Sequence, residues 1–229
     1  MPAQIFKNLD EQSLRNFEIF RDCPSRLYSS LMTKFERHYY QRGDHLFLEG
    51  DPVRGIYCIY SGSVKIAKKS YAGLTNIIFI YKSWDVIGLR SAMSQKKHAA
   101  TATALEPTEV GLLTTDILFA HIAKCPDTQI KIMRLLCKAS DDLENRMMNF
   151  MQKSVPSRLA ETLLLLQESF GTDPENNIKI TLNFSEIAAL VHTSRFTLYR
   201  IFNRWRRMGI IRTRGRKIQI ANSTALIKI

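Results

Sequence analysis

The stretch SEIAALVHTSRFTLYRIFNRWRR, residues 185–207, decides the fold of the C-terminal part of this chain. Its first half places Ile187, Leu190 and Val191 at positions i, i+3 and i+4, which gives one apolar helical face. Ser185 is a favourable N-cap residue for this helix. The residues 192–194 that follow are polar and interrupt the apolar pattern. The sequence therefore predicts a short helix followed by a break.

The second half of the stretch separates an apolar stripe from a basic one. Ser194 can cap this helix with its side-chain oxygen. The apolar stripe, at i, i+3, i+4 and i+7, comprises Leu198, Ile201, Phe202 and Trp205. The opposite face carries Arg195, Phe196, Tyr199, Arg200, Asn203 and Arg204. A helix in a DNA major groove needs one buried face and one basic, hydrogen-bonding face, so the stretch predicts a helix-turn-helix.

An αα-hairpin with solvated arginines is the alternative interpretation of this stretch. A solvated helix face normally interleaves both signs of charge. Here no Asp or Glu occurs from Phe196 to Ile229, whereas eight Arg or Lys residues lie between Arg200 and Lys217, ends included. The uninterrupted basic run favours binding to nucleic acid.

The chain of 229 residues is long enough for one large domain or two modest ones. Residues 153–229 hold 13 Lys and Arg against 5 Asp and Glu, and so contribute +8 of the formal net charge of +12. This asymmetry predicts a polyanion-binding module joined to a more neutral one. The N-terminus lacks the pattern of a secretory signal, and no apolar run approaches the ~20 residues that span a bilayer. We therefore expect a cytoplasmic protein with no membrane partner.

The cysteines are scattered along the chain without a CxxC pair, at Cys23, Cys58, Cys125 and Cys137. In a cytosolic protein they are expected to be reduced thiols that act as small apolar residues. A zinc or iron–sulfur site needs its thiolates gathered, and this spacing gives no reason to expect that.

The histidines are expected at the surface and offer no haem ligands; they are His38, His45, His98, His121 and His192. No cofactor can be named from the sequence.

Short helices and then short strands are expected in the N-terminal half. Residues 5–40 read as helical segments separated by Pro24, with Ser25 able to cap the second segment. From Tyr39 the pattern changes to β-like runs punctuated by turn residues, at 45–52, 55–69, 75–88, 98–104 and 108–114. Many short strands at even spacing predict a small antiparallel sandwich or barrel.

A long helix is expected from Pro126, because no helix breaker follows before Pro156. A seam with alternating spacings of three and four comprises Met133, Leu136, Ser140, Leu143, Met147 and Phe150. Such a seam predicts pairing with the same helix of a second copy. Packing of the seam against the β-domain alone is the alternative. A second stripe, formed by Ile132, Leu135 and Ala139, could cover the β-domain.

The remaining C-terminal segments complete the fold prediction. A hinge at 154–157 is followed by a helix that ends at Gly171, a short strand at 178–182 and the helix-turn-helix. Residues 210–220 predict a basic hairpin that turns at Gly215 and can track phosphates. The predicted fold is α+β. Its parts are an antiparallel β-roll sensor domain (1–125), a long dimerisation helix (126–153) and a winged helix-turn-helix DNA-binding domain (154–229).

In this order the three parts resemble the cyclic-AMP receptor/FNR (Crp/Fnr) superfamily of bacterial transcription regulators. The resemblance covers nearly the whole chain. It is carried by GDHLFLEGDP (43–52) with YCIYSGSVKI (57–66), by ATALEPTEV (102–110), by VPSRLAETLLLL (155–166) and by residues 185–207. It implies a jelly roll of the cyclic-nucleotide-binding type, with an effector between this roll and the long helix. The implied partners are a second copy of the chain, a palindromic operator in double-stranded DNA, and RNA polymerase.

The expected effector pocket departs from the cyclic-AMP binders of this family. Gly88-Leu89 stands where they carry Gly-Glu for the ribose, and His98-Ala99 begins the segment that matches their Arg-Ser-Ala for the cyclic phosphate. Leu143-Glu144 stands where Thr-Ser meets the adenine. A buried phosphate without its arginine is a poorly compensated charge, for which His98 could be a partial substitute. We expect a different, more hydrophobic effector, or a filled pocket and activity without any ligand. FNR-type oxygen sensing needs cysteines ahead of the roll, and only Cys23 lies there.

On the DNA side, Arg195 and Arg200 match two base-reading positions of the family. Phe196 stands where the family usually has Glu, and it can meet a thymine methyl group but cannot accept a hydrogen bond from cytosine. His192 stands where the family has a glycine in the turn. The residues expected at the DNA are Ser194, Arg195, Phe196, Thr197, Tyr199, Arg200, Asn203, Arg204, Arg214 and Lys217, of which the last two lie in the hairpin and would meet phosphates.

Two other functional classes stay open. A ligand-binding signalling module could use its basic tail to bind nucleic acid without specificity. An enzyme is the second alternative, but no clustered Ser/His/Asp, paired carboxylates or Gly-rich phosphate loop points to one. The sequence therefore predicts a sequence-specific transcription regulator that is not an enzyme.

Overall fold

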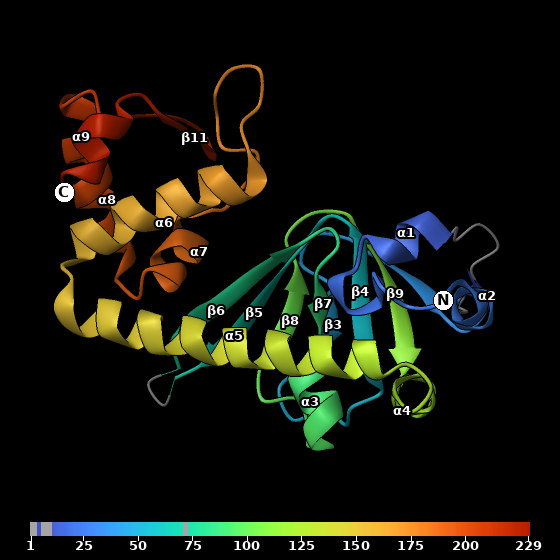
Figure 1. The fold of residues 1–229 in the computed structure, drawn as a ribbon. Helices are drawn as coiled ribbons and strands as arrows, with labels where there is room; N and C mark the ends of the chain where they lie inside the picture. Colours follow the sequence, from blue (N-terminus) through green and yellow to red (C-terminus); the bar gives the residue numbers. More distant parts are fainter. Residues whose placement is uncertain (1–3, 6–10, 71–72) are drawn as a thin grey trace. The chain divides into compact units, whose positions relative to one another are not determined.

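The computed structural model describes residues 4–5, 11–70 and 73–229 of the chain (Figure 1). These residues form two compact units, one within residues 1–68 and 78–142 and the other within residues 69–77 and 143–229. None of the helices in these described ranges is both long and apolar enough to cross a membrane.

Two antiparallel sheets form the frame of the first unit. In the described residues one sheet has the order β1 (Gln4–Ile5), β2 (Glu36–Tyr40), β9 (Thr108–Thr114), β4 (Gly55–Ser61) and β7 (Val86–Ile87). The other sheet has the order β3 (His45–Phe47), β8 (Thr101–Ala104), β5 (Ser63–Lys69) and β6 (Thr75–Lys82). The predicted antiparallel β-roll of short strands is confirmed.

Strand β4 divides the interior of the first unit into two cores. Residues 55–59 are all buried, because both faces of the strand are covered. Tyr57 and Ile59 belong to a cluster that also takes side chains from the other sheet, namely Phe47, Val64 and Ala102. Ile56 and Cys58 belong instead to a cluster formed with the helices. Successive side chains of a strand point to opposite faces, so one strand serves both cores.

Short helices supply the second of these cores. They are α1 (Glu11–Arg15), the 3-10 helix η1 (Glu18–Phe20), α2 (Ser25–Met32), α3 (Leu89–Ser94) and α4 (Thr115–Ile122). Helices α3 and α4 were not predicted. The prediction that Ser25 caps α2 is wrong, because Pro24 is the N-cap residue and the Ser25 hydroxyl donates to Glu11, 3.0 Å away.

The long helix α5 (Pro126–Gln152) confirms the prediction from its lack of breakers. Ile132 is fully buried in the helical core of the first unit, and Leu135 and Leu136 pack partly buried against it. Ile132 and Leu135 of the predicted covering stripe therefore pack against the first unit, together with Leu136, which was predicted for the seam.

The expectation that thiols and histidines stay apart is wrong at one place. Cys23 and Cys125 come together with His121 inside the first unit, and all three side chains are buried. Burial of His98 and His121 also contradicts the expected surface positions. His121 and Cys125 are four positions apart, but Cys23 is 98 positions from His121, and no local spacing reveals that it joins them.

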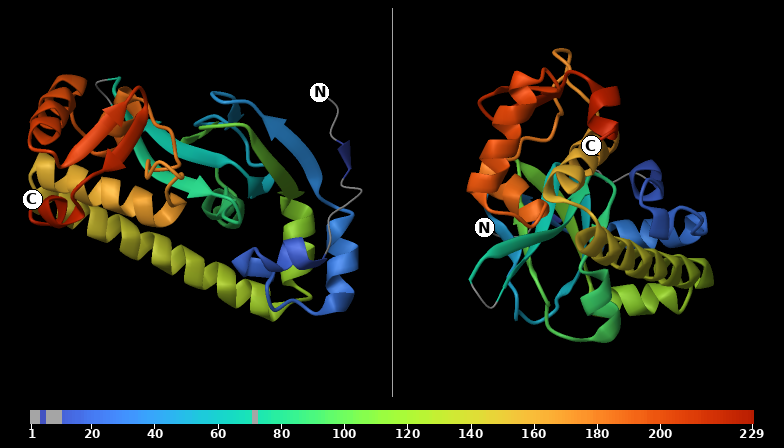
Figure 2. Two further views of the ribbon diagram at one scale, coloured as in Figure 1. Left: turned by 90° about the horizontal axis from the view of Figure 1, so that it is seen from above. Right: turned by 90° about the vertical axis from the view of Figure 1, so that its left-hand side faces the viewer.

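The second unit is a winged helix-turn-helix (Figure 2). It contains α6 (Val155–Phe170), α7 (Phe184–Leu190), α8 (Arg195–Arg207), the strand pair β10 (Ile211–Arg214) and β11 (Lys217–Ile220), and α9 (Ser223–Ile227). Ser154 caps α6 by accepting from the backbone N–H of Ser157, with Pro156 in the first turn. The strand pair turns at Gly215, where φ is +60°, as predicted.

One prediction for this unit is wrong, and one helix was not predicted. Residues 178–182 do not form a strand, because this segment takes part in one isolated bridge, between Thr172 and Ile178. Its apolar side chains are nevertheless buried, which explains the alternating pattern in the sequence. The terminal helix α9 was not predicted.

Candidate nucleic-acid interface

The rotation of α8 about its own axis is fixed by the side chains that it buries. Leu198 and Phe202 are fully buried and Trp205 is 3% exposed. The Phe202 ring packs edge-on against Phe184 of α7, with ring centroids 5.3 Å apart. Burial of this stripe turns the opposite face of α8 to the surface.

The start of α8 is held by the predicted cap. The Ser194 side chain accepts a hydrogen bond from the Thr197 backbone N–H at 3.0 Å, and the two hydroxyls lie 2.9 Å apart. For α7, however, the expected cap at Ser185 is wrong. Asn183 caps this helix in a capping box with Glu186, with both hydrogen bonds 2.9 Å long. Asn and Ser are equally good caps, so the sequence could not decide between them.

The turn between the two helices uses a histidine in place of a glycine. His192 adopts φ +53°, in the left-handed region, where His is several-fold more frequent than most non-glycine residues. The Thr193 N–H donates to the Ala188 carbonyl at 2.9 Å, which is the outer hydrogen bond of a Schellman motif. The turn therefore closes without the glycine.

The outward face of α8 carries the residues predicted to read bases. Arg195, Tyr199, Arg200 and Arg204 are exposed, and Phe196 is 72% exposed. The Arg200 guanidinium lies over the Phe196 ring, 5.9 Å from its centroid. A basic surface that also offers an exposed aromatic ring suits base edges and phosphates together.

Two arginines that the sequence did not single out position this face. Arg206 donates to the Asn203 side-chain oxygen and, over 3.4 Å, to the Thr213 hydroxyl of β10, so it ties α8 to the wing. Arg158 donates to the Val191 carbonyl at the end of α7 and to the Lys153 carbonyl before α6. The contacts of Arg158 join a side chain to the backbone of other segments, and such contacts leave no periodic pattern in a sequence.

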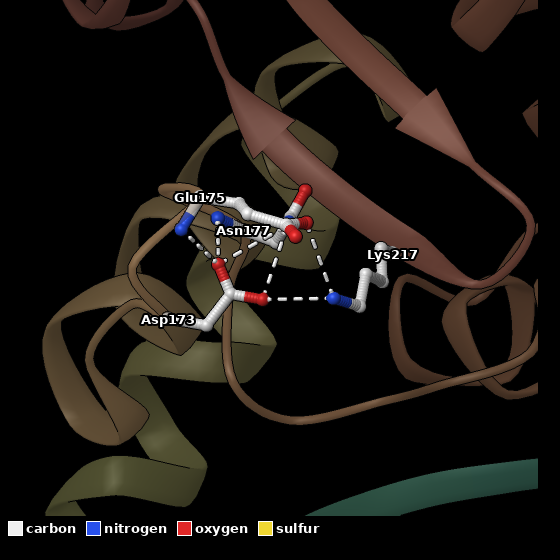
Figure 3. Close-up of polar contacts among 4 residues, drawn as sticks. All are labelled: Asp173, Glu175, Asn177 and Lys217. Atoms are coloured by element: carbon white, nitrogen blue, oxygen red, sulfur yellow. Dashed lines mark hydrogen bonds and ion pairs between the residues drawn. The ribbon is translucent and has the colours of Figure 1, made fainter.

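The wing is anchored by an acidic loop that partly neutralises it (Figure 3). Lys217 pairs with Asp173 at 3.1 Å and with Glu175 at 3.3 Å. The Asp173 carboxylate also accepts from the side-chain and backbone N–H groups of Asn177. These hydrogen bonds, led by that of the Asn177 side chain, lower the pKa of Asp173 to about 2. Lys217 thus already has anionic partners, whereas exposed Arg214 has no ion pair among the described residues.

The predicted effector residues lie in different parts of the fold. Gly88 caps α3 with φ +83°, and a Cβ added there would lie 3.7 Å from the His98 ring. His98 is 3% exposed and stacks on Phe47 with centroids 3.6 Å apart. Its Nε2 atom has no hydrogen-bond partner in the described part of the chain.

The other predicted effector residues differ in burial and in the unit they belong to. Leu89 is buried and Ala99 is exposed, whereas Leu143 and Glu144 lie on the part of α5 that belongs to the second unit.

The predicted seam of α5 is largely exposed in the single chain. The exposed fractions are 51% for Met133, 40% for Leu143, 65% for Met147 and 54% for Phe150. Ser140 is exposed as well, whereas Leu136 is half-buried. The Phe150 ring lies under the Arg158 guanidinium, 4.9 Å away. An exposed row of large apolar side chains marks a surface for association.

Comparison with known proteins agrees with this architecture. Residues 37–124 match the cyclic nucleotide-binding domain family and residues 157–229 match the Crp-like helix-turn-helix domain family. The CRP-like cAMP-activated global transcriptional regulator of Mycobacterium tuberculosis is 27% identical over 220 residues, which cover 95% of this chain and 98% of that protein. The fumarate and nitrate reduction regulatory protein of Yersinia pestis is 27% identical over 192 residues, 82% of this chain and 76% of that protein.

Solved structures share the fold at lower identity. FixK2 from Bradyrhizobium japonicum superposes with a TM-score of 0.75 at 20% identity, over 85% of this chain and 96% of that one. The c-di-GMP-responsive global regulator CLP of Xanthomonas campestris gives a TM-score of 0.74 at 18% identity, over 87% of this chain and all of that one.

The anchoring loop predicts a pH dependence of stability. Because the pKa of Asp173 is lowered on folding to about 2, its stabilisation is present above the unfolded pKa of about 3.9 and is lost as pH falls through 2. We expect Asp173→Asn to lower the urea midpoint of unfolding at pH 5, and the difference from wild type to shrink as the pH falls. Glu168→Gln, on α6, is the control. A difference that stays constant down to the acid limit contradicts the assignment.

Proposed function

Because the chain belongs to the Crp/Fnr superfamily of transcription regulators, we propose that two copies bind one palindromic operator in double-stranded DNA. Each copy would place α8 in a major groove, and the wing would lie along the backbone. The relatives are transcription regulators, and the proposed activity is DNA binding in the cytoplasm rather than catalysis.

The observation that carries this proposal is the outward face of α8. It is exposed because the other face is buried, and it presents arginines at both ends of a polar and aromatic surface. No acidic residue follows within the chain, so phosphates would meet no carboxylate from this segment. Specific recognition needs both base-edge and phosphate contacts, and this face can supply both.

Individual roles follow from where each side chain lies. Arg195, in the first turn of α8, and Arg200 can each reach guanine O6 and N7 with two hydrogen bonds. Tyr199 is exposed between them in the helical projection, whereas Ser194 and Thr197 are engaged with each other and would approach the backbone. Asn203 and Arg204 would face the backbone too, although the Asn203 oxygen is held by Arg206.

The effector is proposed to differ from cyclic AMP, or to be absent. Burial lowers the pKa of His98, against the opposing effect of Asp51, so its imidazole is neutral near pH 7. A neutral ring stacked on Phe47 does not replace the arginine that balances a cyclic phosphate. Relatives are described as responsive to cAMP or to c-di-GMP, so the shared fold does not select one effector. An apolar ligand near Leu89 would suit a pocket in which Leu89 and Ala99 stand in place of polar residues of cyclic-AMP binders.

Pairing of α5 with the α5 of a second copy is proposed to make the dimer. Met133 of the seam lies in the first unit and is 51% exposed, which argues against the alternative that the β-roll covers the whole seam. A dimer would also place two recognition helices about one helical turn of DNA apart, as palindromic half-sites require. Contact with RNA polymerase would then make the bound dimer a regulator of transcription.

Base readout by Phe196 gives the sharpest test of the proposed function. With no acceptor at this position, we expect a base pair that offers a thymine methyl group. Phe196→Glu should move the preference to a pair whose cytosine offers its N4 amino group. Selection from randomised half-sites, run on both proteins, measures this. Identical preferences at every base pair would show that Phe196 is not a reader, and no enriched sequence at all would favour non-specific binding.

The wing offers a matched pair of substitutions. Arg214→Ala should weaken binding to all sequences alike and reduce the salt dependence, log K against log salt, by about one unit per subunit. Lys217→Ala should reduce it much less, because Asp173 and Glu175 already compensate this charge. Fluorescence anisotropy over a salt series with one operator fragment measures both. If both variants reduce the salt dependence equally, the ion pairs of Lys217 break when the protein binds DNA.

Assembly can be tested within the seam. Leu143→Asp would bury an unpaired charge from each copy at the proposed interface. Each charge costs about 3 kcal/mol or more, so the dimer dissociation constant should rise by well over about a hundredfold. Leu165→Asp makes the same change at an α6 residue that is 59% exposed, and should leave the dimer intact. Sedimentation velocity at micromolar concentration distinguishes the two. A monomeric wild-type protein would contradict the proposal.

A further inference from the structure

Three buried side chains form a grouping that DNA binding does not use. Cys23, His121 and Cys125 are 4%, 7% and 2% exposed. Their ligand atoms all lie within 4.8 Å of one another. The Cys23 Sγ atom is 3.7 Å from the His121 Nε2 atom. Thr128 places its hydroxyl oxygen 3.2 Å from the same Nε2 atom and is 1% exposed.

The spacing of these atoms fits a tetrahedral metal ion. With Zn–S of about 2.3 Å and Zn–N of about 2.0–2.1 Å, a tetrahedral angle puts sulfur and nitrogen roughly 3.5 Å apart. The observed separation of 3.7 Å is nearly that value, so a metal could enter with a small contraction. A pair of thiols and an imidazole are donors that zinc prefers among biological ligands.

The backbone around the grouping is already organised. His121 lies in the last turn of α4 and Cys125 directly precedes α5, and the Cys125 N–H donates to the His121 carbonyl at 3.0 Å. Cys23 follows η1, whose Phe20 packs its ring edge-on against that of His121, 5.6 Å away. Three segments thus hold the donor atoms from different sides.

We propose that Cys23, His121 and Cys125 bind one zinc ion, with the Thr128 hydroxyl or a water at the fourth position. Two thiolates and a neutral imidazole balance the two charges of the ion, so the site is electrically neutral and compatible with burial. Each bound thiol gives up its proton when the metal binds. The ion would join the N-terminal helices to the junction of α4 and α5, and so fix the base of the long helix.

Cys58 is a buried thiol with no metal-binding partners in the described part of the chain, and it serves as a comparison for Cys23 and Cys125. Cys58 is fully buried in β4 and belongs to no such grouping among the described residues. There the thiol acts as a small apolar residue. Cys58→Ser is therefore a matched control for Cys23→Ser and Cys125→Ser, because each replaces a buried thiol by a hydroxyl.

The test measures metal directly. Protein purified without chelator should hold one zinc per chain, and Co²⁺ added to metal-free protein should give thiolate charge-transfer bands and the visible bands of tetrahedral cobalt. Cys23→Ser, Cys125→Ser and His121→Gln should lose affinity by more than the roughly 10–100-fold that changes outside the ligand set cause. Cys58→Ser should keep the bands. Wild-type protein without these bands, or with the same weak binding as Cys23→Ser, overturns the proposal.

A second measurement avoids dependence on folding of the variants. In the wild-type protein, zinc should slow alkylation of Cys23 and Cys125, located by peptide mass spectrometry, and leave exposed Cys137 unchanged. It should also raise the unfolding temperature, since a ligand that binds only the folded state stabilises it. A Cys23–Cys125 disulfide in the purified protein, or the visible absorption of an iron–sulfur cluster, overturns the mononuclear site.

Discussion

Burial of Leu198, Phe202 and Trp205 is the constraint on which the direction of the exposed basic face of α8 depends. A helix of 13 residues has about three and a half turns, so fixing one stripe fixes the direction of every other side chain. The arginines need no contacts of their own to be oriented, because packing on the far side of α8 orients them. The direction of the basic side chains therefore depends on the apolar residues of this stripe.

Local patterns predicted the elements whose signal lies within one segment. The apolar spacing of residues 198–205 predicted which face of α8 is buried, and the absence of helix breakers before Pro156 predicted the length of α5. The cap of α7 was missed because Asn183 and Ser185 are both favourable caps, and only the hydrogen bonds distinguish them. Residues 178–182 have the alternation of a strand but find no continuous partner, and partners are a property of the whole fold.

The side-chain groupings could not be predicted in the same way. Cys23 and His121 are 98 positions apart, and Lys217 is 44 positions from Asp173. Charge counting places Lys217 with the other cations of the wing, whereas the structure pairs it with the loop before it. The basic surplus of the C-terminal part is thus distributed unevenly. Arg214 has no ion pair among the described residues, whereas Lys217 is paired with Asp173 and Glu175.

The distribution of thiols also gives the protein a built-in attachment point. Of the four cysteines, all of them in the described part of the chain, Cys137 is exposed and the other three are buried. It lies in the middle of α5, beside Leu136. A nitroxide or a fluorophore can therefore be fixed there without first removing any native cysteine. In an assembly of two copies, the distance between the two labels, and the spread of that distance, would report the separation and mobility of the two long helices.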